Sequence, residues 1–258
     1  VVTPAKGREM FVANTTGTSS ADRIEGMIKN TIYGIIAAKT CGIAHPTVGI
    51  LNVDGARQTE KALKKLQENG YPIEFAESGR ADGGCVMRGN DVLQASPDIM
   101  VTDSLTGNIM VKMLSSFTTG GSFEATGYGY GPGIGEGYEQ LVMIVSRASG
   151  APVIAGAIRY AAQLVRNKVF EVAKAEFAAA KKAGLKKILD ARKAAAKPAG
   201  AGSHRSKGSA KRDRDIPDCG NRSYGSGRCG ESTVEAEHLC RERNGLYRTD
   251  HSCIRCKP

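Results

Sequence analysis

The residues best suited to chemistry in this sequence lie in one short segment, residues 102–108, which combines an acidic side chain, a hydroxyl and a glycine. A glycine lets the backbone approach an anion closely. A helix is expected directly after this segment, and free N–H groups at a helix start bind phosphate. The same residue types also cap helices, so both interpretations stay open. The predicted phosphate- and acyl-binding residues are Asp103, Thr106, Gly107, Asn108 and Lys112.

Cys85 is the residue that the sequence offers as a nucleophile. It ends the segment Gly79–Cys85, in which Arg80 could lower the pKa of the thiol and favour the reactive thiolate. Free cysteines are mostly buried and inert, so a structural role is the alternative for Cys85 and is favoured for Cys41. His45, which precedes a proline in a loop, is likewise expected to be structural.

The elements that must position these residues follow from hydrophobic periodicity. Apolar residues recur at helical spacing over residues 22–39 and 56–69, and helices are also expected at 109–117 and 153–182. Short apolar runs predict strands at 48–53, 73–76, 98–102 and 141–145. The repeated order of strand, loop and helix predicts a layered α/β domain with a mainly parallel sheet and flanking helices.

Ligands of such sheets bind beyond the carboxyl ends of the strands. The loops expected at that edge are 52–57, 77–84, 102–108 and 146–152. A glycine-rich run at 127–137 has the composition of a nucleotide loop, but a strand rather than a helix follows it. The run is therefore interpreted as a flexible loop over the site or a subunit contact.

Residues 98–112 resemble the aspartate, Thr-Gly-Asn and lysine pattern of the phosphate acyltransferases of phospholipid synthesis. Three further segments resemble one branch related to them, the alpha subunits of component C of the glycine reductase complex; they are Thr3–Glu9, Gly79–Cys85 and Ser146–Pro152. The resemblance covers about residues 1–195. It implies the isopropylmalate dehydrogenase-like or phosphate acyltransferase-like fold.

The resemblance also implies a function: transfer of an acyl group from a cysteine thioester to phosphate, giving acetyl phosphate in amino-acid fermentation. The implied partners are the beta subunit of component C and the selenoprotein component of the complex, in an oligomer. Phosphate is a substrate, and no cofactor or metal is expected. The family's thiol lies in a Gly-Cys-Thr-Gly-Pro segment that this sequence lacks, so a non-catalytic scaffold subunit is the alternative.

The composition changes near residue 197, which predicts a domain at 1–195 and a linker and tail at 196–258. Five of the seven cysteines and three of the four histidines lie in the tail. With few aliphatic residues, the tail is expected to be disordered. Suitable codons for His238–His251, shifted by one base, can spell the Gly-Cys-Thr-Gly-Pro segment. One hypothesis is therefore that the tail is an out-of-frame version of the family's thiol-bearing domain.

Two other interpretations of the tail remain. A zinc-binding module is suggested by Cys253 and Cys256 with His238, Cys240 and His251, although a structural zinc site prefers two CxxC pairs. A basic nucleic-acid arm is disfavoured because only Tyr224 and Tyr247 could stack on bases.

The whole chain carries 36 Lys and Arg against 26 Asp and Glu and is 41% hydrophobic, within the range of soluble domains. No apolar run approaches the roughly 18 residues of a membrane span, and no signal pattern opens the chain, so a cytoplasmic location without membrane contact is expected. Because residue 1 is valine, the chain is expected to be a C-terminal fragment whose N-terminal half is missing.

Overall fold

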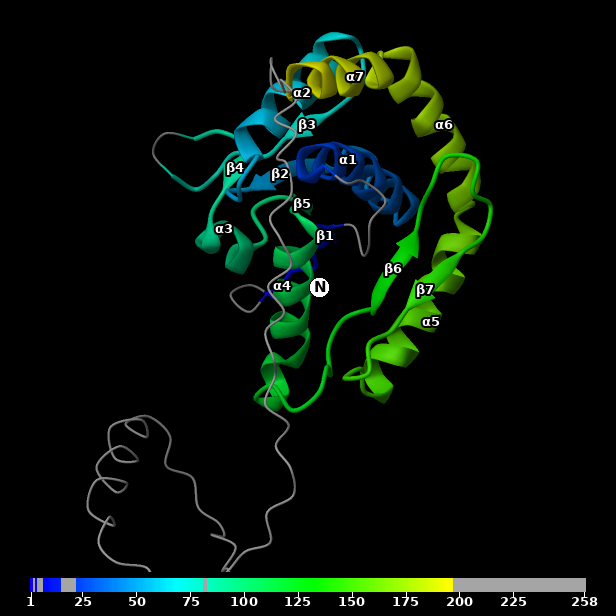
Figure 1. Ribbon diagram of the computed structural model, residues 1–258. Coiled ribbons are helices and arrows are strands. Elements are labelled where there is room, and N and C mark those ends of the chain that lie inside the picture. The colour runs from blue at the N-terminus through cyan, green and yellow to red at the C-terminus, as the bar shows by residue number, and fades with distance from the viewer. Residues whose placement is uncertain (2, 4–6, 15–21, 81–82, 197–258) are drawn as a thin grey trace, which may run out of the picture. The chain divides into compact units, whose positions relative to one another are not determined.

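The computed structural model describes residues 1, 3, 7–14, 22–80 and 83–196 (Figure 1). These residues belong to one compact unit, Val1–Ala201. The predicted tail lies outside the described residues from residue 197 onward, so its predicted disorder, shifted frame and zinc site remain predictions. None of the described helices is long and apolar enough to cross a membrane.

A parallel sheet forms the centre of the domain. Its strands are ordered β1–β5–β2–β3, and β4 also pairs with β2. All of these pairings are parallel, which confirms the predicted α/β class. The strands are β1 (Phe11–Ala13), β2 (Thr47–Leu51), β3 (Glu74–Phe75), β4 (Val86–Met87) and β5 (Ile99–Val101).

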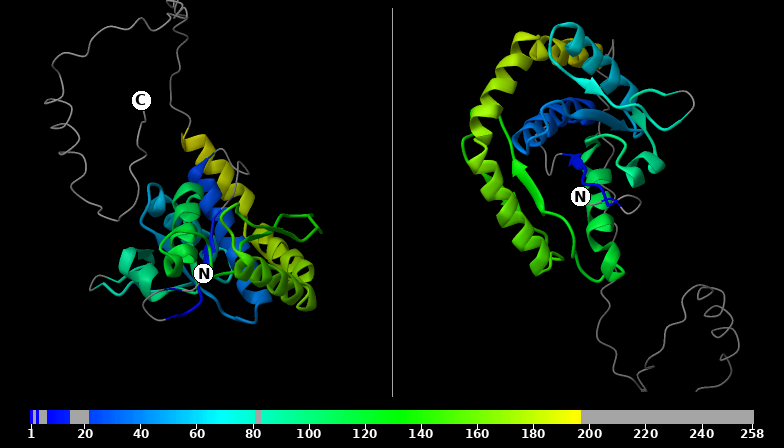
Figure 2. Two further views of the ribbon diagram at one scale, coloured as in Figure 1. Left: turned by 90° about the horizontal axis from the view of Figure 1, so that it is seen from below. Right: turned by 180° about the vertical axis from the view of Figure 1, so that it is seen from behind.

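Helices cover both faces of this sheet. On one face, α1 (Arg23–Thr40) and α2 (Ala56–Glu68) pack on side chains such as Ile50 and Ile99, while α6 (Val169–Lys182) and α7 (Leu185–Ala196) form an outer layer (Figure 2). On the other face, the short α3 (Gly89–Gln94) and α4 (Ser104–Ser116) cover Met87 and Met100. A 3₁₀ turn, Phe117–Thr119, follows α4.

The predicted strand at 141–145 is not part of the parallel sheet, which corrects the sequence-based expectation. β7 (Val142–Ile144) pairs antiparallel with β6 (Tyr130–Gly133), and α5 (Ala151–Arg166) follows this separate hairpin. The side chains of Val142 and Ile144 are exposed, unlike those of a central parallel strand. An apolar run predicts a strand but does not show which other strand it pairs with.

Two predicted helices also differ from the structure. α4 begins at Ser104 rather than at residue 109, because Asp103 caps it and most of the predicted loop 102–108 is helical. The helical stretch expected at 153–182 is divided into α5 and α6 by Asn167 and Lys168, and Lys168 has a left-handed backbone with φ of 56°.

Gly34 sets the closest approach of α1 to the sheet. A Cβ there would lie 2.6 Å from Cγ2 of Ile99 and 3.0 Å from Cβ of Ala13. We expect Gly34→Ala to lower the free energy of unfolding by about 1–3 kcal/mol through overpacking, measured by urea denaturation. Gly89→Ala is the control, because a Cβ at Gly89 meets nothing within 4 Å. Equal stability of both variants would show that α1 can shift to make room.

Candidate functional site

The carboxyl ends of the parallel strands bring several polar side chains to one edge of the sheet. β5 is followed by Thr102 and Asp103, and the loop after its neighbour β2 contains Asp54. α1 begins at the same edge, where Nη1 of Arg23 lies 3.2 Å from Oδ2 of Asp54. This is the edge at which the sheet topology predicts a ligand.

Asp103 is the N-cap of α4. Its Oδ1 accepts hydrogen bonds from the backbone N–H groups of Leu105 (3.0 Å) and Thr106 (3.1 Å), and its Oδ2 accepts one from the Thr106 hydroxyl (2.7 Å). Burial alone would raise the pKa of Asp103, but these hydrogen bonds and the charge of Arg23 outweigh burial and lower it. The capping interpretation is confirmed for Asp103, whereas Thr106 lies inside α4 and its hydroxyl donates to the capping carboxylate. The carboxylate occupies N–H groups that would otherwise face a phosphate.

Thr102 carries a buried hydroxyl that has no hydrogen-bond partner within the described part of the chain. Its backbone is held in place, since its N–H donates to the carbonyl of Ala13 (3.1 Å) and its carbonyl accepts from Nδ2 of Asn30 (3.2 Å). A buried polar group without a partner costs about 1–3 kcal/mol. The Thr102 hydroxyl is therefore an unsatisfied polar group at this edge, and it is covered by protein in the structure.

Gly107 and Asn108 lie inside α4, whereas the sequence predicted them in the loop before a helix. A Cβ on Gly107 would lie 2.2 Å from Nδ2 of Asn14, so the glycine lets α4 approach the end of β1. Asn108 is the fifth residue of α4 and lies one turn inside the helix, not at its start. The binding role of the Asn108 side chain remains a prediction.

Lys112 lies away from Asp103, two turns along α4, and contacts Glu124 instead. Its Nζ is 3.3 Å from Oε1 of Glu124 and 5.2 Å from the centre of the Tyr130 ring. The Glu124 side chain is 2% exposed and also accepts hydrogen bonds from the Tyr130 hydroxyl (2.6 Å) and the Ser149 hydroxyl (2.6 Å). This network joins α4 to the β6–β7 hairpin.

Cys85 lies in the core and is 3% exposed. Burial, with a smaller contribution from the neighbouring Glu60 carboxylate, raises the pKa of the Cys85 thiol to about 11. This direction is opposite to the sequence-based prediction, in which Arg80 lowers the pKa of the Cys85 thiol. The structure thus separates Cys85 from the residues at the end of β5 and keeps its thiol protonated at neutral pH.

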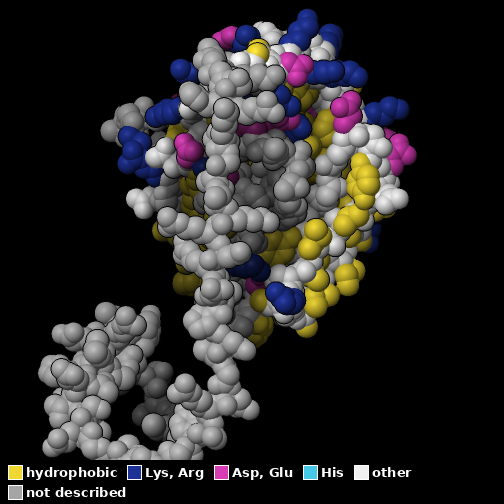
Figure 3. Space-filling model, viewed as in Figure 1, with side chains coloured by type: hydrophobic (Ala, Val, Ile, Leu, Met, Phe, Trp, Pro, Cys, Tyr) yellow, Lys and Arg dark blue, Asp and Glu magenta, His cyan; other side chains and the backbone are white. Residues whose placement is uncertain are grey.

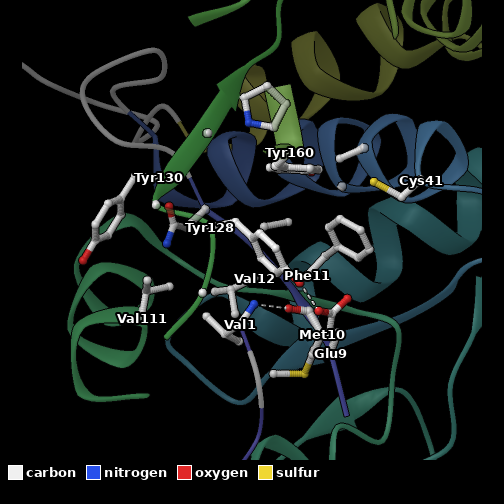
Figure 4. A pocket seen from close by; sticks show the side chains of 18 of the residues that line it. Val1, Glu9, Met10, Phe11, Val12, Cys41, Val111, Tyr128, Tyr130 and Tyr160 are labelled. Carbon is white, nitrogen blue, oxygen red and sulfur yellow. Dashed lines mark hydrogen bonds between the residues drawn. The ribbon is translucent and has the colours of Figure 1, made fainter. Parts of the chain in front are cut away.

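A cavity of about 410 Å³ lies between β1, α1 and the β6–β7 hairpin (Figure 4). None of the predicted site residues lines it. Its wall opposite β1 is formed by the glycine-rich segment, including Tyr128 and Tyr130. Cys41 and Tyr160 are hydrogen-bonded on the α1 side, and burial raises the pKa of both.

Three residues that matter here were missed from the sequence. Arg23 follows a helix cap at the carboxyl edge, a position that could have drawn attention to it. Thr102 carries no signal of a missing partner, and nothing near Glu124 in the sequence indicates its network. In the described ranges, no group of three His, Cys, Asp or Glu side chains could hold a metal ion.

Comparison with known proteins gives one family match and several relatives. The family model described as "Fatty acid synthesis protein" matches residues 1–203. Over 189 residues the chain is 66% identical to the glycine/sarcosine/betaine reductase complex component C subunit alpha of Peptoclostridium acidaminophilum, covering 73% of this chain and 49% of that protein.

Phosphate acyltransferases are more distant relatives. That of Phenylobacterium zucineum is 33% identical over 28% of this chain and 20% of its own length. That of Agrobacterium fabrum is 31% identical over 42% and 30%. The chain spans about half the length of the component C relative and less of the acyltransferases. No solved structure gave a significant match.

The burial of Cys85 predicts slow alkylation. At pH 8, a pKa of about 11 leaves about one thiol in a thousand as thiolate, so iodoacetamide should label Cys85 far more slowly in folded protein than in urea. Peptide mass spectrometry gives the rate for each cysteine. Labelling of folded Cys85 at the unfolded rate would contradict the buried position.

Glu124→Gln tests the network that holds α4 to the hairpin. Hydrogen bonds outweigh burial and lower the pKa of Glu124, so its stabilising effect is present above about pH 4.5 and is lost as the pH falls through the folded pKa. We expect a loss of about 1.5–3 kcal/mol at pH 7 that shrinks at acidic pH, measured by urea denaturation. Glu171→Gln, in the exposed pair with Lys168, should change little. An equal loss at every pH would show that the charge is unimportant.

Proposed function

The chain belongs to the fatty acid synthesis protein family, and we propose that it is an alpha subunit of component C of a glycine reductase-type complex that supports acyl transfer from a cysteine thioester to phosphate. In this step a phosphate oxygen attacks the thioester carbonyl, the C–S bond breaks, and acetyl phosphate and a thiolate are released. The similarity to a component C subunit and to phosphate acyltransferases supports this chemistry.

The observation that carries the proposal is the unpartnered hydroxyl of Thr102 at the carboxyl edge of the sheet. Arg23 places a guanidinium at this edge, in an ion pair with Asp54, and the neighbouring Ile24 lies close to Gly55 at the start of α2. Gly55 gives α2 no side-chain cap. The N–H of Ala56 donates to the carbonyl of Val53 (3.0 Å), while the next N–H groups of α2 have no side-chain acceptor of the kind that Asp103 provides to α4. A hydroxyl, a guanidinium and a helix start without a side-chain cap suit an anion such as phosphate.

The residues predicted to bind phosphate or the acyl group keep those roles as part of this proposal. In it, the cap formed by Asp103 and Thr106 fixes the start of α4, and Gly107 keeps the helix close to β1. Asn108 and Lys112 lie further along α4 and remain proposed phosphate- or acyl-binding residues, with the Lys112 ammonium in contact with Glu124. Preorganised donors at this edge would stabilise the charge that develops on the attacked carbonyl.

The reactivity of Cys85 bears on which cysteine would carry the thioester. Burial and the high pKa make Cys85 a poor nucleophile, which favours a thioester carried by another cysteine of the complex. The proposal places the beta subunit of component C and the selenoprotein component as partners, in the cytoplasm, with phosphate as substrate.

A non-catalytic scaffold subunit is the second candidate function, and exposed apolar side chains favour it. Such side chains gather over β7 and α5 (Figure 3), and a stripe with a spacing of four residues runs along α4. Apolar surface of this extent is typical of protein contacts. The exposed residues are Val142, Ile144, Ile154, Ile158 and Val165 on the first surface, and Leu105, Ile109 and Met113 on α4 with Phe117 in the 3₁₀ turn that follows it.

Thr102→Val separates the two functions. Without phosphate, the variant should be more stable by about 1–3 kcal/mol, because the unpartnered hydroxyl is gone. Inorganic phosphate should raise the melting temperature of the original chain, and the variant should lose this response. In an acetyl phosphate assay with an acetyl thioester, the phosphate concentration at half-maximal rate should rise about tenfold, the effect of one lost hydrogen bond of about 1.4 kcal/mol.

Thr47→Val is the matched control at the opposite edge of the sheet. The Thr47 hydroxyl donates to Oδ2 of Asp98 (2.8 Å), so its loss should destabilise the fold and leave the phosphate response intact. If phosphate stabilises neither the original chain nor Thr47→Val, and no acetyl phosphate forms, the enzyme proposal is wrong and the scaffold function is supported.

A further inference from the structure

The positive charge of residues 1–196 is concentrated in two segments, α2 and residues 181–196 at the end of α6 and in α7. These segments contain ten Lys and Arg against three Asp and Glu, whereas the rest of residues 1–196 contains 13 Lys and Arg against 15 Asp and Glu. Lys and Arg side chains accordingly gather over α2 and α7 at the top of Figure 3. The domain therefore has a basic region, while its remainder is slightly acidic.

Helices α2 and α7 lie side by side, so their charges share one surface (Figure 1). At one end, Nδ2 of Asn69, the C-cap of α2, donates to the carbonyl of Ala183 just before α7 (2.9 Å). At the other end, both helices reach the start of α1. Gly55, the N-cap of α2, lies against a side chain of α1, and Arg192 of α7 pairs with Asp22, the N-cap of α1. The two helices are therefore antiparallel neighbours.

Five lysines of this surface have no acidic partner among the described residues. Other charges there are balanced, since Arg57 and Lys64 pair with Glu60 while Arg192 and Lys193 pair with acidic residues of α1. The five unpaired lysines form what we call the basic ridge, and all are exposed: Lys61, Lys65, Lys182, Lys186 and Lys187. Like charges one helical turn apart, as at Lys61 and Lys65, repel each other. An acidic partner would relieve this repulsion.

The side chains around the basic ridge indicate which kind of partner fits. Among the described residues, no large exposed apolar side chain lies on α2 or α7, so the ridge lacks the residues that insert into a membrane. Neither helix contains an aromatic side chain on which a base could stack. The exposed carboxylates of Glu68 and Asp190 would repel a phosphate backbone, but they can pair with basic residues of a protein.

We propose that the basic ridge is a docking surface for the acidic face of a partner protein. Exposed charges act mainly on the rate of association and are screened by salt, so this contact suits a partner that binds and leaves. A permanent subunit would instead use the apolar surfaces on α4 and on β7 and α5, because obligate interfaces are more hydrophobic. The inference is independent of the phosphate site and of acyl transfer.

Two triple variants of the full chain, equal in their change of charge, test the proposal with a fluorescent polyglutamate peptide as the probe. Lys61→Glu/Lys65→Glu/Lys186→Glu reverses the ridge, and the control reverses three exposed side chains of α5 and α6, Arg159, Arg166 and Lys174, to Glu. We expect the ridge variant to bind the peptide about tenfold more weakly, measured by fluorescence anisotropy. At physiological ionic strength, charges more than about 8 Å away are screened, so the control should bind like the original chain.

Both variants keep residues 197–258, so the charges of that segment contribute equally to the comparison. Because the substituted side chains are exposed, the melting temperatures should change little. If the ridge variant unfolds, Lys61→Gln/Lys65→Gln/Lys186→Gln removes the charges without reversing them and should weaken binding by a smaller factor.

Three results would overturn the docking surface. The first is absence of peptide binding to the original chain at physiological ionic strength. The second is equal weakening in both variants, which would show that net charge rather than the ridge attracts acids. The third is tighter binding of single-stranded DNA or phosphatidylserine vesicles than of the peptide, lost in the ridge variant, which would assign the ridge to a nucleic acid or a membrane. None of these measurements involves phosphate or acetyl transfer, so failure here leaves the proposed function untouched.

Discussion

Helix α1 must be covered on nearly every side, and the placement of the other elements follows from that requirement. Twelve of its 18 residues are buried, so it has no broad polar face. The sheet covers it where Gly34 allows close approach, and α6 covers it from outside. Glu176 on α6 accepts hydrogen bonds from Lys39 (2.5 Å) and Tyr71 (2.8 Å), which fixes the outer layer to the inner one.

The same burial determines the geometry at the carboxyl edge. α1 begins there, capped by Asp22, so a rigid helix places Arg23 beside the ends of β2 and β5. Asn30, about two turns further on, donates to the carbonyl of Thr102 and holds the end of β5. The Thr102 hydroxyl is left without a partner among the described residues by a framework that cannot relax around it. The stable core thus keeps an unsatisfied hydroxyl at the edge where a ligand is proposed.

Much of this fold could be predicted from the sequence, because α1 and α2 have clear helical periods and β2, β3 and β5 lie in apolar runs. Sequence patterns failed where long-range contacts decide. Gly107 predicted a loop, but it lies inside α4, where the absence of a Cβ lets the helix pack closely against Asn14. Lys168 has a left-handed backbone without the glycine that usually marks one. The partner of β7 depends on burial, which an apolar run does not specify.

The sequence indicated the end of β5 as the place to look for a site, but it could not give the contacts that the side chains make there, for a similar reason. The parallel topology directs attention to the end of β5, and Asp103 lies there. Whether a carboxylate caps a helix or binds a substrate depends on which donors reach it, and α4 provides those donors itself. The cysteine prediction depended on Arg80, while burial and Glu60 set the pKa of Cys85. Partners in space, not residue types, decide such roles.

Helix α4 connects the carboxyl edge of the sheet with the cavity. Its first turn lies at the carboxyl edge, while Val111 and Ser115 on its later turns line the cavity beside β1. The buried Glu124 binds Lys112 and so ties the middle of the helix to the hairpin wall of the same cavity.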